Sequence, residues 1–225
     1  MIEYASRDGR RRLFAGDSRR LGPIASASVG VIVTSPPYWQ RGRGLASAER
    51  YARQLALEFA PEWRRVLLPD GDLWIVIGDR HDGREWAGVD GLLTTWLRRA
   101  GFGLQAKGCW AQTRSREPWY DRINYVLRFR KAGRRAPPSR TTLCWMLPLP
   151  RSHRASLWDA TPDPVIRCAI EESRRRGTVL DPFAGAGTVG LIATAMGRDW
   201  VGVEKDPRMA ALAARRLRLR RVRGS

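Results

Sequence analysis

Strand-like and helix-like hydrophobic patterns alternate along this chain, and that alternation limits its fold more than any other feature. Short apolar runs rich in valine and isoleucine predict buried strands, whereas apolar residues recurring every three or four positions predict helices. The predicted strands are residues 11–16, 29–34, 72–79, 104–112, 123–131, 178–185 and 199–206. The predicted helices are residues 48–68, 88–102, 163–177, 187–197 and 207–221, with a turn at residues 69–71 after the first of them.

Strands that alternate with helices build a mostly parallel sheet, because each helix returns the chain to the edge from which the next strand starts. We therefore predict an α/β fold with a Rossmann-like, doubly wound, mostly parallel sheet. Residues 104–112 and 123–131 follow one another without a helix between them, so we expect one of them to run antiparallel. The length of 225 residues suits one domain with a full core, over residues 1–225. Polar stretches at residues 112–122 and 131–162 are predicted to be loops at the ligand-binding edge.

The chain carries a formal net charge of +19, from 41 lysines and arginines against 22 aspartates and glutamates. Nearly all of the basic residues are arginines, whose guanidinium groups suit paired hydrogen bonds to phosphate. An arginine-rich proteome accounts for part of this charge. A polyanionic partner accounts for it better, and nucleic acid is favoured over an anionic membrane surface.

The sequence contains no run that approaches the length of a membrane-spanning helix, and its first 14 residues lack the apolar stretch of a signal peptide. The cysteines Cys109, Cys144 and Cys168 have neither the spacing of a disulfide framework nor that of a zinc site. We therefore expect a cytoplasmic protein. No metal site and no membrane contact are predicted.

The sequence TSPPYW, residues 34–39, follows the apolar run of residues 29–33 and must end that strand. Proline has no N–H to donate to a sheet and restricts the backbone, so two consecutive prolines make a stiff segment. In open α/β sheets, ligands bind at the carboxyl ends of the strands. We therefore predict that Ser35, Tyr38 and Trp39 are held rigidly beside a ligand. The alternative is a stiff loop whose aromatic rings pack only on the core.

A glycine-rich turn between a strand and a helix predicts a second binding element. Gly185, Gly187 and Gly190 have the spacing of a dinucleotide-binding turn, and Glu204 ends the next predicted strand, where a carboxylate can bind a ribose diol. Asp181, before the turn, can hold an ammonium group or cap the helix. S-adenosylmethionine has both a ribose and an α-amino group, so it matches all three features. A nicotinamide cofactor is the alternative, although a dinucleotide fold normally continues with several more strands.

TSPPYW and DPFAGAGT (residues 181–188) together resemble the amino-methylating DNA methyltransferases. The order of the motifs is that of the permuted, or beta, group, in which the catalytic motif precedes the cofactor motif. FAGDS, which contains Asp17, resembles the amino-terminal motif of that group, and residues 67–79, 100–110 and 122–133 resemble its next blocks in the expected order. The resemblance covers most of residues 11–219. It implies a circularly permuted methyltransferase fold, S-adenosyl-L-methionine as cofactor and DNA as substrate. It also implies a nucleoid-associated protein of a prokaryotic or phage host.

The resemblance also implies roles for the matching residues. In the family, the serine oxygen and the next backbone carbonyl accept hydrogen bonds from the exocyclic amine of a base, which frees its lone pair for attack on the methyl group. Here these groups are Ser35 Oγ and the carbonyl of Pro36, with Pro37 adding stiffness and Tyr38 stacking on a base flipped out of the duplex. The implied cofactor-binding residues are Asp17, Asp181, Phe183, Gly185, Gly187, Thr188 and Glu204.

In this family the form Ser-Pro-Pro-Tyr goes mostly with the N4 amine of cytosine, and Asp or Asn in the first position goes mostly with the N6 amine of adenine. The resemblance therefore favours a site-specific, cytosine-N4-specific DNA methyltransferase of a restriction-modification system. An adenine-N6 enzyme is the first alternative. A DNA-binding, methyltransferase-like subunit without activity and an RNA methyltransferase are the others.

The recognition region expected between Lys131 and His153 is short, so we predict a short target-recognition insert at residues 131–160. A short insert reads few base edges, which predicts a short or degenerate site. The partner is expected to be DNA, as a duplex with a flipped base or as a single strand, and a homodimer stays open because related enzymes often dimerise. The DNA-binding candidates are Trp39, Arg41, Arg114, Arg116, Arg134, Arg135 and Arg140, and for each arginine a solvated loop position is the alternative.

Overall fold

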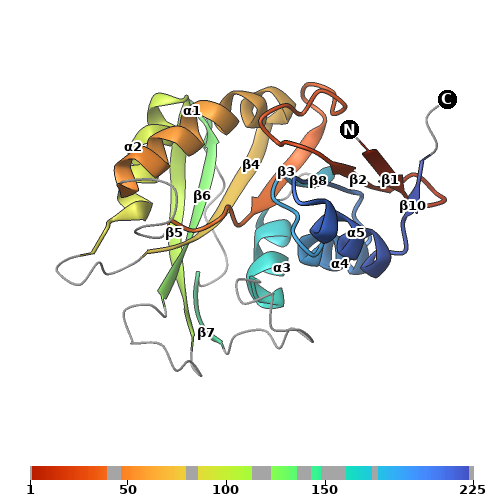
Figure 1. Ribbon diagram of the computed structural model, residues 1–225. Helices are drawn as coiled ribbons and strands as arrows, with labels where there is room; N and C mark the ends of the chain where they lie inside the picture. Colours follow the sequence, from red (N-terminus) through yellow and green to blue (C-terminus); the bar gives the residue numbers. More distant parts are fainter. Residues whose placement is uncertain are drawn as a thin grey trace.

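The computed structural model describes residues 2–39, 47–79, 86–112, 123–135, 143–147, 161–173 and 177–222. These residues form a ten-stranded sheet with helices on both faces (Figure 1). The strands are β1 (Ile2–Ala5), β2 (Arg11–Ala15), β3 (Val29–Thr34), β4 (Leu67–Gly78), β5 (Phe102–Gln112), β6 (Ile123–Lys131), β7 (Cys144–Leu147), β8 (Thr178–Asp181), β9 (Trp200–Glu204) and β10 (Arg220–Arg221). The helices are α1 (Ala48–Val66), α2 (Val89–Arg99), α3 (Asp163–Glu172), α4 (Thr188–Ala195) and α5 (Pro207–Arg216).

The strands are arranged in the order β10-β1-β2-β9-β8-β3-β4-β6-β5-β7. The central strands β2, β9, β8, β3 and β4 are parallel to their neighbours in this run. β6 lies antiparallel between β4 and β5, which confirms the predicted α/β sheet with an antiparallel strand. At the other end of the sheet, β1 runs antiparallel to both β2 and β10, and neither β1 nor β10 was predicted.

Helices cover both faces of the sheet, α1 and α2 on one face and α3, α4 and α5 on the other (Figure 1). Each face has its own hydrophobic core, in which apolar residues of the helices pack on the strands. All six residues of β3 are buried, as expected for a parallel strand covered on both sides. The carboxyl end of β3 therefore opens in the middle of the molecule, between the two helix layers.

The turn predicted at residues 69–71 is wrong, because these residues belong to β4, which starts at Leu67 directly after α1. The pairing of β3 with β4 shifts register between Val29 and Val31, and this irregularity accommodates the proline and glycine. A side chain at Gly71 would lie 3.1 Å from the carbonyl oxygen of Gly30 and 3.2 Å from that of Val29. Glycine is present there because two backbones approach closely.

Other predicted boundaries also differ from the structure. The predicted loop at residues 131–162 contains β7, which pairs in parallel with the far side of β5. The last predicted helix ends at Arg216 instead of residue 221, because Arg218 has a φ of 55° and the chain then enters β10. Within the described residues, no helix is long and apolar enough to cross a membrane.

Candidate active site at the carboxyl ends of β3 and β8

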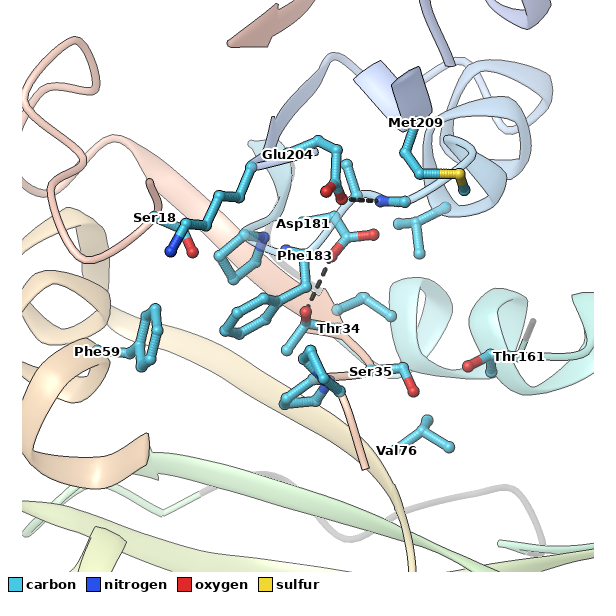
Figure 2. Close-up of a pocket in the computed structure, with 18 of the residues that line it drawn as sticks. Ser18, Thr34, Ser35, Phe59, Val76, Thr161, Asp181, Phe183, Glu204 and Met209 are labelled. Carbon is cyan, nitrogen blue, oxygen red and sulfur yellow. Dashed lines mark hydrogen bonds between the residues drawn. The ribbon is translucent and has the colours of Figure 1, made fainter. Parts of the chain in front are cut away.

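Two loops leave the carboxyl ends of the neighbouring strands β3 and β8. The chain continues from β3 to α1 on one face of the sheet and from β8 to α4 on the other (Figure 1). Where two such paths diverge, a ligand-binding crevice is expected. A cavity of about 580 Å³ lies there. It brings both predicted motifs into one wall (Figure 2). The predicted site residues in that wall are Asp17, Ser35, Pro36, Pro37, Tyr38, Asp181, Phe183, Gly185, Thr188 and Glu204.

The segment after β3 is held by side chains from outside it, because its two prolines have no N–H to donate. The buried Tyr51 hydroxyl on α1 donates to the Pro37 carbonyl oxygen at 2.8 Å. Burial raises the pKa of Tyr51, so this hydroxyl stays protonated and remains a donor. Ser35 Oγ donates a long hydrogen bond of 3.3 Å to Tyr38 Oη, which leaves the lone pairs of Ser35 Oγ available to a ligand.

The ring of Tyr38 lies against the backbone of Gly78 at the end of β4. A side-chain carbon at Gly78 would lie 2.7 Å from Tyr38 Cδ2, closer than side-chain carbons approach one another. Only glycine leaves room for the ring in this position. The carboxyl end of β4 therefore helps to place Tyr38 at the wall of the cavity.

Asp181 ends β8 and is buried. Its Oδ1 accepts a hydrogen bond from the Thr34 hydroxyl at 2.9 Å and one from the backbone N–H of Phe183 at 3.1 Å (Figure 2). Burial raises the pKa of Asp181 to about 7, the nearby charge of Glu204 raises it further, and the two hydrogen bonds oppose this shift. Asp181 thus caps its own turn and can also present carboxylate charge to a cation.

The glycine turn and Glu204 are joined directly. Glu204 Oε2 accepts from the N–H of Gly185 at 2.7 Å (Figure 2). Its Oε1 accepts from the N–H of Asp206 at 2.8 Å. Gly185 has a φ of +51°, and the nearest heavy atom to a side chain there would be 4.0 Å away, so the turn leaves open space beside the cavity. Gly187 also has a positive φ, but a side chain there would meet Leu217 at 3.0 Å, so it serves close packing on the segment after α5.

Aromatic rings and a charged cluster complete the wall. Phe183 packs against Phe59 with ring centroids 5.0 Å apart, and Trp63 lies edge-on to Phe183 at 6.4 Å. Arg19, also in the wall, forms ion pairs with Asp17 and Glu58. The hydrogen bond from Arg19 holds the pKa of the Asp17 carboxyl at about 2.

The predicted DNA contacts divide into three groups. Trp39 is 6% exposed and belongs to the hydrophobic core on the α1 and α2 side, so its ring is not presented to a ligand in this structure. Arg134 and Arg135 are exposed after β6. Arg41, Arg114, Arg116 and Arg140 lie outside the described residues.

Sequence reasoning missed several residues of the wall. Gln54, Glu58 and Phe59 come from α1, Thr161 lies just before α3, and Ile166 is in the first turn of α3. Their patterns are those of ordinary amphipathic helices, so no signal in the sequence marks them. Thr34 had a signal, because it immediately precedes Ser35, but its contact with Asp181 depends on strand order.

The cavity fits a nucleoside that carries an amino-acid tail. The aromatic rings around Phe183 offer a flat apolar surface, Glu204 and the open turn at Gly185 offer polar contacts, and the buried Asp181 offers a negative charge. These elements lie in one wall with Ser35 and Tyr38. The residues present therefore fit S-adenosylmethionine beside a second ligand at the β3 segment.

Comparisons with known proteins support this description. Residues 110–215 match the family model of the N6/N4 DNA methylases. A candidate DNA modification methylase from Thermus thermophilus, crystallised with S-adenosyl-L-methionine, is 30% identical, with a TM-score of 0.72, and the match covers 91% of this chain and 92% of that one. The cytosine-N4-specific PvuII DNA methyltransferase shares the fold, with a TM-score of 0.76, 20% identity and coverage of 91% and 85%.

Among curated proteins, the type II methyltransferase M.XycI of Xanthomonas campestris pv. cyanopsidis is 28% identical over 269 residues, covering 91% of this chain and 87% of its own. M.SmaI of Serratia marcescens is 26% identical over 268 residues, covering 93% and 91%. The sequence matches, the fold and the shared wall of the cavity agree. This chain belongs to the N6/N4 DNA methylase family and is a DNA methyltransferase.

Proposed function

We propose that this protein transfers a methyl group from S-adenosylmethionine to the exocyclic N4 amine of a cytosine flipped out of duplex DNA. The observation that carries the proposal is the single cavity whose wall contains both Ser35 and Asp181. A methyl donor bound along β8 and β9 and an amine bound at Ser35 would therefore meet inside one protein site. The serine form of the motif is what favours cytosine over adenine.

The chain activates the amine through two acceptors. The lone pair of an exocyclic amine is delocalised into the ring, so the amine is a poor nucleophile. Ser35 Oγ and the Pro36 carbonyl accept its two N–H groups and hold the nitrogen in the geometry for attack. Among the described residues, no hydrogen bond to the Pro36 carbonyl is formed, so it remains available to the amine. When bound, S-adenosylmethionine would supply a methyl group on a positively charged sulfur, which departs as a neutral thioether when the C–S bond breaks. The methylated amine then loses one proton to solvent.

Other residues position the two ligands. Tyr38 stacks on the flipped base, and Pro37 fixes the segment through its carbonyl bond to Tyr51. Asp181 faces the cationic amino group of the cofactor, Glu204 binds the ribose, and Phe183 packs on the adenine. Asp17, Gly185 and Thr188 complete the cofactor contacts, and Gly187 shapes the turn. Exposed arginines such as Arg134 and Arg135 bind DNA phosphates.

The first test is mass spectrometry of nucleosides from mixed-sequence DNA incubated with the protein and S-adenosylmethionine. N4-methylcytosine is the expected product. N6-methyladenine would overturn the assignment of the base while keeping the acceptor chemistry. Methylation of RNA in preference to duplex DNA in a competition assay would overturn the assignment of DNA as the substrate.

The second test separates an active enzyme from a silent DNA-binding subunit. Ser35→Ala removes one acceptor of the amine and should lower kcat by about a hundredfold, a size typical of losing one preorganised polar group. DNA affinity, measured by fluorescence anisotropy, should stay near that of the wild type. Ser28→Ala is the matched control, because Ser28 is an exposed residue before the opposite end of β3. Equal activity of Ser35→Ala and Ser28→Ala would contradict the proposed role.

A further inference from the structure

Asn124 is a buried polar residue whose amide is not satisfied by the fold. Its side chain is on β6, and the residue is 3% exposed. Its Nδ2 has no hydrogen-bond acceptor among the residues that the structure describes. A buried donor without an acceptor destabilises the folded state, so such a group calls for an explanation.

Strand pairing brings Asn124 to the same edge of the sheet as the active site. β6 runs antiparallel to β4, and in this register Asn124 stands opposite Gly78, the last residue of β4. A side-chain carbon at Gly78 would lie 2.7 Å from Tyr38 Cδ2 and 3.2 Å from Asn124 Oδ1. The Tyr38 ring and the Asn124 amide therefore meet over the same glycine.

Two other buried donors lack acceptors among the described residues, Trp63 Nε1 and Trp200 Nε1. Each belongs to a large indole ring that buries apolar surface in a core, and this burial offsets the cost of one unpaired N–H. Asn124 brings no such apolar surface. A leucine has the same number of side-chain heavy atoms and carries no unpaired polar group, so packing alone does not account for asparagine.

We propose that Asn124 reads the target base, with its Nδ2 donating a hydrogen bond to the ring nitrogen next to the reactive amine, which is N3 in cytosine. This inference rests on the proposed function, because it needs a base stacked on Tyr38 with its amine at Ser35. Asn124 is not part of the cavity wall in this structure, so the contact requires the neighbouring Tyr38 ring to turn as the base stacks.

The chemistry of the base edge matches this arrangement. In cytosine, N3 is an acceptor bonded to the carbon that carries the amine, so acceptors for the amine and a donor for N3 must stand side by side. Ser35 Oγ and the Pro36 carbonyl are the acceptors, and Asn124 Nδ2 is the donor. Thymine carries N–H at this ring position and would set donor against donor. With Nδ2 turned toward the base, the Asn124 contact thus disfavours thymine and fixes the rotation of the cytosine ring.

The decisive experiment is a double-mutant cycle between the protein and the base. The substrate is a duplex with one cytosine that the wild type methylates, and its partner carries 3-deazacytosine there, which keeps the amine but has C–H in place of N3. Wild-type kcat/KM should fall at least about tenfold on the modified duplex. For Asn124→Leu, kcat/KM on normal cytosine should be at least about tenfold below that of the wild type. It should fall no further on 3-deazacytosine. Equal sensitivity of both proteins to the modification would overturn the proposal.

Asn124→Asp keeps the shape and provides a readout that a structural role would not move. Its carboxylate faces N3 with acceptors only, whereas the protonated acid donates as the amide does. Activity of this variant relative to the wild type should therefore rise as the pH falls from 8 to 5.5. A constant ratio would contradict the inference, and this test remains available if Asn124→Leu fails to fold. The Kd for S-adenosylmethionine should be unchanged in both variants.

Product analysis of the wild type separates failure of this inference from failure of the proposed function. If the wild type makes N6-methyladenine, the cytosine assignment fails. The same cycle is then run with 1-deazaadenine, because N1 of adenine stands next to its amine as N3 does in cytosine. If 1-deazaadenine lowers kcat/KM equally for the wild type and Asn124→Leu, the role of Asn124 is overturned. If it lowers kcat/KM for the wild type alone, the role is supported for adenine.

Discussion

The hydroxyl of Thr34 donates a 2.9 Å hydrogen bond to Asp181 Oδ1, and this contact joins the catalytic segment to the cofactor loop. The two residues end the neighbouring strands β3 and β8, and both are buried. Ser35 directly follows Thr34, and the glycine turn begins four residues after Asp181. A change in the charge or position of Asp181 therefore acts on Thr34, the residue next to Ser35, whose hydroxyl is the proposed acceptor of the target amine.

Asp181 makes the stability of the protein depend on pH. Its pKa is raised from 3.8 to about 7, so the folded state binds a proton more tightly than the unfolded state. Its neutral form therefore favours folding below about pH 4, and this contribution is lost as the pH rises to about 7. The melting temperature of the wild type should fall relative to that of Asp181→Asn over this range. Parallel melting curves across pH 4 to 8 would contradict the prediction.

Thr34→Val removes the hydroxyl but keeps the shape of the side chain. The hydrogen bond from Thr34 lowers the pKa of Asp181, so its loss should raise that pKa further. The pH at which affinity for S-adenosylmethionine reaches half its maximum should move upward, as measured by calorimetry between pH 5.5 and 9. Thr34→Ser keeps the hydroxyl and is the control. Identical profiles for Thr34→Val and Thr34→Ser would show that the hydrogen bond does not govern Asp181.

Tyr51→Phe tests how the proline segment is positioned. It removes the 2.8 Å hydrogen bond to the Pro37 carbonyl and leaves the ring in the core. We expect stability to fall by about 1 kcal/mol. The value of kcat should fall several-fold, whereas the Kd for S-adenosylmethionine should stay the same. Tyr4→Phe on β1, at the other end of the sheet, is the matched control and should leave kcat unchanged.

Gly78→Ala should displace the Tyr38 ring, because the new carbon would lie 2.7 Å from Tyr38 Cδ2. Stacking on the target base should weaken, so KM for DNA should rise and kcat should fall. Binding of S-adenosylmethionine should stay normal, since Gly78 is absent from the cavity wall. A variant with wild-type kinetics would show that the position of Tyr38 does not depend on this glycine.

Asp72→Ala should be severely destabilising. Asp72 is 1% exposed and accepts hydrogen bonds from the buried guanidinium groups of Arg128 and Arg130. Removing the carboxylate leaves both guanidinium groups without this anionic partner. Breaking a buried ion pair in this way lowers the free energy of unfolding by about 3–5 kcal/mol. Chemical denaturation provides the measurement. Asp199→Asn, which breaks an exposed pair with Arg10, is the control and should unfold at nearly the wild-type denaturant concentration.

Local patterns were sufficient for most of the elements. The apolar run of residues 29–34 forms β3 with the predicted bounds, because a run rich in valine and isoleucine indicates a strand buried on both faces. Residues 123–131 likewise became β6 as predicted. The error at residues 69–71 has a different origin. Proline and glycine signal a turn locally, and only the pairing of β3 with β4 shows that they form an irregular stretch of strand.

The sequence by itself determined the α/β class, the order of most of the elements and the two motifs, because hydrophobic period, proline stiffness and glycine turns act over a few residues. The tertiary structure alone decided which distant residues share the cavity. Thr34 reaches Asp181, Tyr51 holds Pro37 and Asn124 stands beside Tyr38 only because of strand order, register and helix packing. Such contacts depend on how separate segments bury apolar surface together, and no short stretch of the chain carries that information.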